Sequence, residues 1–352
     1  MPLLARMLLA PLFIDIRAGA VSGLGDLLAD RRISADGHVA VAVGPGQGER
    51  LADSIRPTLG NAEVFTVRGG TVDAAGELQA ALRSKHFDAL VGIGGGRTLD
   101  VAKYAATRSA LPMVAVATNL AHDGIASPVS SLEYEGGKGS FGVSLPIAVV
   151  VDLDYVRSSP PRMVRSGVGD VVSNLSAIDD WRLAAMERQE PVDGLAVTFA
   201  QTAASSILHR TDGIDSDRFL VALAEALVLS GLAMAAAGSS RPCSGADHEI
   251  LHAIEHLFPG AGSHGELAGM GALFASFLRK DAAAAALVDA CLRRHDLPRV
   301  PSDLGLSADQ FGTAVDYAPR TRPDRFTILE HLQLTSADVR DRVAEFGDLY
   351  GG

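Results

Sequence analysis

The sequence predicts an α/β amino-terminal domain followed by an all-α carboxyl-terminal domain, and two observations carry this prediction. Over roughly residues 1–150, short apolar segments alternate with segments of helical length, which is typical of a parallel sheet covered on both faces. From Pro160 onward the strand signals end, and long Ala- and Leu-rich helical patterns replace them. We therefore expect two domains, 1–157 and 158–352, packed closely with a cleft between them.

The individual strands and helices follow from these patterns. An edge strand is expected over residues 13–16, and buried strands are expected over residues 38–44, 63–67, 88–93, 112–117 and 147–152. The intervening helices are expected at 48–59, 73–84 and 97–108, with a hairpin-like excursion at 131–144. In the second domain, helical periodicity predicts helices over 193–209, 217–237 and 281–295.

The composition excludes two classes of partner. The formal net charge of -11 argues against a nucleic-acid surface, which needs a basic face. No apolar stretch reaches the ~20 residues of a membrane span, so we expect no membrane partner. Hydrophobic residues make up 47% of the chain, which allows a large core. We expect a homo-oligomer that acts on a small molecule.

Two further features indicate a cytoplasmic protein. Residues 1–10 look superficially like a signal sequence, but Arg6 and Pro11 interrupt the apolar run and no cleavage site follows clearly. Cys243 and Cys291 are expected to be free thiols in a reducing compartment rather than a disulfide.

Two glycine-rich turns indicate a nucleotide site. Residues 94–96 are three glycines between a predicted strand and a predicted helix, where free amides and the helix dipole attract phosphate. A tight turn would explain the three glycines equally well, but Gly44 ends another strand in the same way. Two such turns side by side on one sheet favour a dinucleotide site. Asp100 and Lys103 share the next helix face, as a surface ion pair or as part of the site.

Two histidines and one aspartate form a candidate metal site. His248, His264 and Asp170 offer two neutral imidazoles and one carboxylate, a set suited to a catalytic divalent metal with an open fourth position. From spacing alone, His252 competes with His264, because two histidines four residues apart on a helix also chelate metals. Asp170 by itself would be a helix N-cap, and Glu266 is expected to support the segment after His264.

A run of motifs then resembles a known family. Residues 94–103, followed by His122-Asp123-Gly124-Ile125-Ala126-Ser127-Pro128, closely resemble the sn-glycerol-1-phosphate dehydrogenases of the iron-containing alcohol dehydrogenase and dehydroquinate synthase superfamily. Further matches follow in the family's order: Gly169-Asp170, Ser173-Asn174, Asp180-Trp181, Ser244-Gly245, His248, His264-Gly265-Glu266 and residues 322–330.

The resemblance implies a dehydroquinate synthase-like fold with a parallel Rossmann-like sheet. It implies NAD(P) as cofactor and one Zn²⁺ per chain, with Fe²⁺ or Ni²⁺ as alternatives, held by Asp170, His248 and His264. The implied reaction reduces dihydroxyacetone phosphate, or a related ketone, to sn-glycerol 1-phosphate, or a related alcohol. The metal would act as a Lewis acid on the substrate oxygen while hydride leaves the nicotinamide.

The same resemblance gives roles to residues of the first domain. Asp123 is implied near the reacting carbon and Lys103 near a substrate phosphate. The proton is expected to leave through water, Asp123 or His252, which makes these two residues the catalytic candidates. The residues expected along the cofactor, including those of the two glycine turns, are Gly44, Gly94, Gly95, Gly96, Asp100, Thr118 and Ser127.

Several alternatives stay open at this point. One is a sugar-phosphate cyclase of the dehydroquinate synthase type, one is a dehydrogenase for another polyol, and one is an inactive NAD-binding protein. Leu120 departs from the family's pattern and is expected to reshape the substrate pocket. A substrate phosphate would need cations near the metal; Arg320, Arg322 and Arg325 are candidates, and a solvated basic patch is the competing interpretation.

Overall fold

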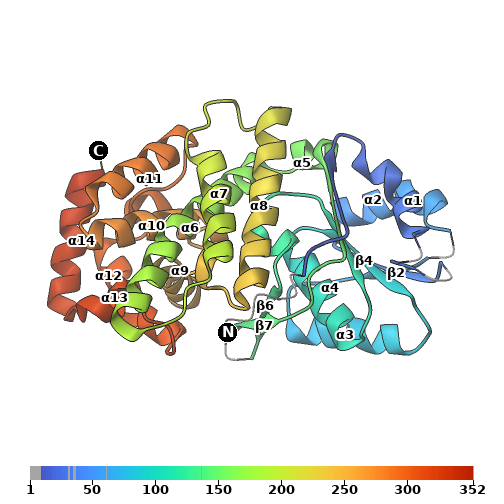
Figure 1. Cartoon of the computed structure of the whole chain (residues 1–352), viewed down its shortest axis with the longest axis horizontal. Coiled ribbons are helices and arrows are strands. Elements are labelled where there is room, and N and C mark those ends of the chain that lie inside the picture. The colour runs from blue at the N-terminus through green and yellow to red at the C-terminus, as the bar shows by residue number, and fades with distance from the viewer. Residues whose placement is uncertain (1–8, 31, 35–36, 61, 136, 352) are drawn as a thin grey trace, which may run out of the picture. The chain divides into compact units, whose positions relative to one another are not determined.

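The computed structural model describes residues 9–30, 32–34, 37–60, 62–135 and 137–351 (Figure 1). Its internal contacts divide the chain into two compact units, Met1–Pro160 and Pro161–Gly352, here called unit 1 and unit 2. Unit 1 combines a parallel sheet with helices, and residues 161–351 of unit 2 are helical with connecting turns, so the predicted fold class is confirmed. Most of the signal-like segment 1–10 lies outside the described residues.

Unit 1 is built on a six-stranded parallel sheet in the order β1-β8-β5-β4-β2-β3. The predicted edge strand is confirmed, because β1 lies at one end of this order. Every residue of β2, β4, β5 and β8 is buried, which explains their continuous apolar sequences. The strands are β1 (Phe13–Arg17), β2 (Val39–Val43), β3 (Glu63–Thr66), β4 (Ala89–Gly94), β5 (Met113–Ala117) and β8 (Ala148–Asp152).

Helices cover both faces of this sheet. Alternate residues of the central strands form one apolar core with α1 and α2, and α4 packs on the opposite face, where the side chains of Leu99 and Ala102 approach Gly92 of β4. Figure 1 shows α1 and α2 on one side of β2 and β4, with α3 and α4 on the other. The helical segments are η1 (Ala20–Gly23), α1 (Leu24–Leu28), α2 (Gln47–Ile55), η2 (Arg56–Thr58), α3 (Val72–Arg83), α4 (Gly96–Arg108), η3 (Asp123–Ile125) and α5 (Leu153–Ser158).

The direction of the chain reverses across the sheet between β2 and β4. From β2 the chain passes through α2 to β3 on one side, and it then returns through α3 to β4 on the other side. The two strands are paired, with Val43 opposite Ile93, and the amide of Gly44 donates to the carbonyl of Ile93 at 3.1 Å. The two glycine turns therefore lie side by side at a topological switch point, where ligands of such sheets bind.

Two local features of unit 1 refine the predictions. The expected excursion is an antiparallel hairpin of β6 (Val129–Tyr134) and β7 (Gly137–Gly142). The helix expected over 48–59 ends earlier, because Pro57 lies in the 3-10 segment η2 that follows α2. A proline disfavours the α conformation of the residue before it, which limits the preceding helix.

Unit 2 is a bundle of helices around the long helix α6. This helix packs against α7, α9 and α10, and α7 packs along α8. The predicted helices over 193–209, 217–237 and 281–295 correspond to α7, α8 and α11. The helical segments are α6 (Pro161–Arg188), α7 (Gly194–Leu208), α8 (Asp217–Ala237), η4 (Arg241–Cys243), α9 (Ala246–Leu257), α10 (His264–Leu278), α11 (Ala282–Arg294), η5 (Pro301–Leu304), α12 (Ala308–Tyr317), η6 (Ala318–Thr321), α13 (Ile328–Leu332) and α14 (Ser336–Tyr350).

One helix of unit 2 bears on the expectation about membranes. Among the described residues, α8 is 21 residues long with a window of mean hydropathy 2.1, so it passes a length and composition test for a membrane span. Length and composition alone are weak evidence for a membrane span, so this helix does not contradict the expectation of no membrane partner. In the structure 61% of that window is buried, and Phe219 and Leu223 are fully buried. A core helix passes the same test, because both environments select apolar residues.

Candidate functional site

Three side chains from three helices converge in unit 2. Asp170 lies in the interior of α6, His248 lies near the start of α9, and His264 is the first residue of α10. The Nε2 atoms of His248 and His264 lie 3.9 and 3.5 Å from Asp170 Oδ1. One potential ligand atom from each residue lies within 4.8 Å of the other two. Asp170 is not an N-cap, because α6 begins nine residues earlier at Pro161.

Paired glycines bring two of these side chains together. A Cβ on Gly265 would lie 1.6 Å from the carbonyl oxygen of Ser166, and a Cβ on Gly169 would lie 2.1 Å from the carbonyl oxygen of Gly265. The backbones of α6 and α10 are therefore in direct contact. Asp170 follows Gly169 and His264 precedes Gly265, so the close approach of the two helices carries the carboxylate to the imidazole.

Glu266 supports the first turn of α10, as expected. Its carboxylate accepts from the amide of Ser263 at 2.7 Å and completes a capping box. It also accepts two hydrogen bonds from Arg162 Nε, at 2.9 and 3.0 Å. Burial raises the pKa of Glu266, but the bonds from Arg162 and Ser263 outweigh it and hold the pKa below its ordinary value. The Glu266 carboxylate thus stabilises the first turn of α10, which begins with His264.

The donor set fits a divalent metal of the zinc type. Two ligands of one tetrahedral Zn²⁺ are separated by roughly 3.3 Å at ordinary bond lengths, close to the distances of 3.5 and 3.9 Å from Asp170 to the histidines. His248 Nδ1 is hydrogen-bonded to the carboxylate of Asp247. A carboxylate on the far nitrogen fixes the tautomer and leaves the Nε2 lone pair for the metal. Sequence reasoning missed Asp247, whose only signal is its place directly before His248.

His252 lies beside this set and makes other contacts. Its Nε2 accepts from Arg322 Nη2 at 3.0 Å, and its Nδ1 lies 3.3 Å from Glu255 Oε2. Burial, with a further contribution from Arg322, lowers the pKa of His252 to about 3, so the imidazole is neutral. Glu255 also approaches His264 Nδ1, at 4.0 Å, a contact that no sequence pattern had indicated. Packing thus separates His252 from the converging ligand atoms, although spacing alone would have permitted it.

The three candidate arginines differ in their environments. Arg320 is exposed and its guanidinium stacks over the ring of Tyr317. Arg322 and Arg325 are partly buried, and burial lowers the pKa of both, that of Arg325 to about 10. Arg325 donates to Ser240 Oγ at 3.0 Å. The solvated basic patch is therefore the wrong interpretation for Arg322 and Arg325.

A buried aspartate fixes the start of the helix that carries His248. Asp180 is fully buried, and its Oδ2 accepts from the amide of Ala246, the first residue of α9, at 2.7 Å. Its Oδ1 accepts from the amide of Ile328 at 2.8 Å and lies 2.5 Å from Arg279 Nη2. One carboxylate from α6 thus holds α9, the tail of the chain and the Arg279 guanidinium of α10.

In unit 1 the three-glycine turn leads directly into α4. The helix begins at Gly96, and no side chain caps the N-cap residue Gly95, so the first amides of the helix are available to a ligand. A Cβ on Gly95 would lie 2.4 Å from Asn119 Nδ2, and one on Gly96 would lie 1.9 Å from His122 Nε2. Because Gly95 and Gly96 have no Cβ, the polar side chains of Asn119 and His122 can pack directly against the turn. This arrangement fits a pyrophosphate that needs close backbone approach.

The other residues expected along the cofactor are buried around this turn. A Cβ on Gly44 or Gly94 would lie 2.4 or 2.9 Å from Thr98 Oγ1, so both glycines pack on the first turn of α4. Thr118 is buried, and its amide donates to the carbonyl of Gly94 at 3.1 Å. Leu120 is fully buried, which makes its polar neighbour Asn119 the residue that faces the turn.

Asp100 and Lys103 form a buried ion pair, which rules out the surface pair that was one of the two alternatives. Lys103 Nζ lies 3.0 Å from Asp100 Oδ1, and the two side chains are 0% and 6% exposed. The same ammonium donates to Ser127 Oγ at 3.2 Å and to the carbonyl of Val129. Burial raises the pKa of Asp100, and Lys103 counteracts this. The pair therefore ties α4 to the segment that carries Ser127.

Asp123 begins η3, directly after the His122 side chain that meets the turn. The His122 Nδ1 accepts from the amide of Gly124 at 3.0 Å, which fixes the loop geometry. The backbone carbonyl of Asp123 accepts from Ala126 at 3.0 Å, and its side chain is half-buried. The motif signal for this loop was sound, but it did not single out His122.

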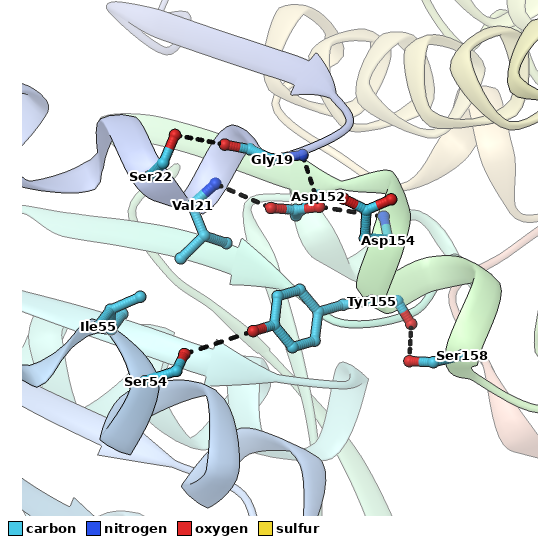
Figure 2. Close-up of a pocket in the computed structure, with 9 residues that line it drawn as sticks. All are labelled: Gly19, Val21, Ser22, Ser54, Ile55, Asp152, Asp154, Tyr155 and Ser158. Carbon is cyan, nitrogen blue, oxygen red and sulfur yellow. Dashed lines mark hydrogen bonds between the residues drawn. The ribbon is translucent and has the colours of Figure 1, made fainter.

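A separate hollow of about 500 Å³ lies in unit 1 near the end of β8. Its lining contains none of the predicted site residues. Figure 2 shows its buried carboxylate, Asp152, turned toward backbone amides: the two oxygens accept from Gly19, Val21 and Asp154 at 3.0 to 3.1 Å. Asp152 therefore closes the turn after β1, and the hollow takes no part in the arrangement described above.

Comparison with known proteins identifies the family. Residues 15–160 match the family described as iron-containing alcohol dehydrogenase. A protein of Methanothrix thermoacetophila named glycerol-1-phosphate dehydrogenase, NAD(P)+, is 33% identical over 329 residues, which are 92% of each chain. One of the same name from Hyperthermus butylicus is 34% identical over 350 residues, covering 97% of this chain and 98% of that protein.

Solved structures agree in fold. A probable glycerol dehydrogenase from Sinorhizobium meliloti has a TM-score of 0.80 at 22% identity, covering 98% of this chain and 99% of that one. An iron-containing alcohol dehydrogenase from Thermotoga maritima has a TM-score of 0.68 at 17% identity, covering 99% and 100% of the two chains. The fold that the resemblance implied is thereby confirmed.

Proposed function

The chain belongs to the glycerol-1-phosphate dehydrogenase family, and from this premise we propose that it is a metal-dependent, NAD(P)-linked dehydrogenase. It reduces dihydroxyacetone phosphate, or a closely related ketone, to sn-glycerol 1-phosphate, or the corresponding alcohol. The observation that carries this proposal is the convergence of Asp170, His248 and His264 in unit 2. A glycine turn at the switch point of unit 1 supports the cofactor.

Asp170, His248 and His264 would hold one divalent metal, and we favour Zn²⁺ over Fe²⁺ and Ni²⁺. When bound, the metal supplies Lewis-acid polarisation of the substrate oxygen, and NAD(P)H supplies the hydride. Asp247 presents His248 through Nε2 by holding Nδ1. The side chain of His264 is 25% exposed against 4% for Asp170, so substrate would approach from the His264 side.

The residues of unit 1 would bind and orient the cofactor. The amides at Gly95 and Gly96, with Gly44 and Gly94 beside them, would hold the pyrophosphate through the helix N-terminus. Asp100, Thr118 and Ser127 would complete the lining of this site. Lys103 is bound by Asp100 and Ser127, so we assign it a positioning role toward the Ser127 segment in place of the substrate contact first expected.

The proton to be exchanged at the substrate oxygen would pass through water, Asp123 or His252. Asp123 follows the loop that covers the glycine turn, which places a carboxylate in the part of unit 1 that binds cofactor. In unit 2, His252 has Glu255 on its Nδ1 side, so a proton gained by the ring would be stabilised by this carboxylate. His252 is thus the candidate within unit 2, and Asp123 is the candidate within unit 1.

A turnover screen tests the proposal. Purified protein loaded with Zn²⁺ is mixed with NADH or NADPH and with dihydroxyacetone phosphate, dihydroxyacetone or related ketones. We expect net oxidation of the cofactor with dihydroxyacetone phosphate and formation of the sn-1 enantiomer of glycerol phosphate. A cyclase would return the hydride and show no net oxidation. No turnover with any ketone in metal-loaded protein would refute the proposal.

A further inference from the structure

Of the three candidate arginines in the tail, only Arg322 is directed at a residue beside the ligand set. Its Nη2 donates to His252 Nε2 at 3.0 Å. Arg320, two residues earlier, covers the ring of Tyr317 at the surface, and Arg325 is bonded to the serines that precede α9. The chain thus directs one guanidinium from η6 toward α9 and leaves its neighbour in solvent.

The position of His252 brings this guanidinium near the proposed metal ligands. The centroid of the His252 ring lies 6.2 Å from that of His248 and 6.4 Å from that of His264. One imidazole therefore separates the Arg322 guanidinium from the ligand rings. Dihydroxyacetone phosphate has a comparable separation of groups, since its reacting carbonyl oxygen is on the central carbon and its phosphate is on a terminal carbon.

The hydrogen bond between Arg322 and His252 is of a kind that an anion can replace. The acceptor is a neutral ring nitrogen, because the other nitrogen of His252 faces Glu255. A hydrogen bond gains further when the acceptor carries the charge opposite to the donor's, because Coulomb attraction between the two groups is added. A phosphate oxygen is thus a better acceptor for this guanidinium than the imidazole that it now contacts.

The charge of the whole protein favours a local cation at the place where a substrate phosphate binds. The formal net charge is -11, and the ligand set itself includes the Asp170 carboxylate and, behind His248, the Asp247 carboxylate. A dianionic phosphate monoester would be repelled by this field unless a cation opposed it. A planar guanidinium matches phosphate with two parallel N–H donors, which an ammonium cannot do.

We propose that Arg322 determines specificity by binding the phosphate group of a phosphorylated ketone, with His252 holding the guanidinium in place when the site is empty of substrate. This inference rests on the proposed function and adds to it the residue that distinguishes phosphorylated from unphosphorylated substrates. The remaining donors of Arg322 would stay with the protein, so the phosphate would displace the imidazole alone.

The first experiment compares two substrates in Arg322→Met. The variant keeps an unbranched, flexible side chain and removes the guanidinium with its charge and donors. We expect kcat/KM for dihydroxyacetone phosphate to fall about 10- to 100-fold, the usual size of a hydrogen bond to a charged group, and kcat/KM for dihydroxyacetone to fall much less, through the lost contact with His252 alone. Arg322→Lys should recover part of the loss, because it restores charge but not the paired donors. Arg320→Met is the matched control and should behave as the wild type with both substrates.

The second experiment does not depend on turnover. Binding of inorganic phosphate to the Zn²⁺-loaded protein is measured by calorimetry in the wild type, Arg322→Met and Arg320→Met. We expect phosphate binding to weaken only in Arg322→Met, with the metal content of all three proteins equal. Equal losses of turnover on both substrates, or phosphate binding unaffected by Arg322→Met, would overturn the assignment. A wild type that binds phosphate through Arg322 but reduces no ketone would instead refute the proposed function.

Discussion

The buried carboxylate of Asp180 gives the sharpest stability prediction. In Asp180→Asn the side chain keeps its shape but loses its charge and exchanges one acceptor for a donor. Three donors now converge on the two carboxylate oxygens: the amides of Ala246 and Ile328 and the Arg279 guanidinium. An amide can satisfy only part of this set, and the Arg279 charge is left in the interior of unit 2 without its counterion.

The expected cost follows from the burial of the pair. The side chains of Asp180 and Arg279 are 0% and 12% exposed, so solvent replaces little of the lost interaction. Removing one partner of a buried ion pair costs about 3–5 kcal/mol. For a domain of this size each kcal/mol lowers Tm by about 2–4 °C, which gives a fall of about 6–20 °C for unit 2. Because Ala246 begins α9, His248 should also hold metal less firmly.

The assay is thermal unfolding followed by circular dichroism, with zinc content measured after dialysis. Asp179→Asn is the matched control, since it is the adjacent residue and the same substitution. Its side chain is 34% exposed and lies 3.4 Å from Arg182, an exposed pair worth at most about 1 kcal/mol. Burial raises the pKa of Asp179, and the charges of Arg279 and Arg182 act against this, so the control removes a second negative charge that acts on Arg279 but none of the direct contacts of Asp180. If Asp180→Asn melts like the wild type, or if both variants lose the same stability, the reasoning is wrong.

Three further predictions concern the metal, the cofactor turn and a thiol. His264→Ala should lose zinc and turnover together while NADPH binding is unchanged; retention of zinc would count against the ligand set. Gly96→Ala should weaken NADPH binding about tenfold, because its Cβ would lie 1.9 Å from His122 Nε2 and overpacking of this kind costs about 1–3 kcal/mol. Gly76→Ala, whose Cβ meets nothing within 4 Å, should bind NADPH normally, and equal affinities in both variants would contradict the argument. Burial raises the pKa of Cys291 to about 11, so mass spectrometry after iodoacetamide at pH 8 should find it alkylated only in unfolded protein; modification of the folded protein would disprove this.

The strands of unit 1 could be predicted because their burial determines which residue types occupy them. β2, β4, β5 and β8 are buried along their whole length, and a strand covered on both faces must be apolar at every position. The order of the strands in the sheet is not indicated by any local sequence pattern. β1 pairs with β8, more than a hundred residues later, and only the shape of the folded sheet specifies this neighbour. The adjacency of the two glycine turns was inferred correctly because both turns serve the same switch point.

The residues around the ligand set were less predictable, since their roles depend on contacts between helices. Asp180 and Arg279 lie on different helices, and their pairing with the start of α9 has no local signature. The same holds for Arg322, which the sequence placed near a solvated patch and which packing directs at His252. A charged residue in a motif can be noticed in the sequence, but its partner comes from another element.

The choice between His252 and His264 shows what local signal was nevertheless present. His264 is followed by Gly265, and Asp170 is preceded by Gly169. Each glycine removes the Cβ that would otherwise separate α6 from α10, with hypothetical contacts of 1.6 and 2.1 Å to backbone oxygens of the other helix. His252 stands between Leu251 and Ala253, so nothing at its position lets another backbone approach as closely. A polar side chain next to a glycine on each of two helices therefore indicates two helices in contact, and the side chains beside those glycines are the ones that meet.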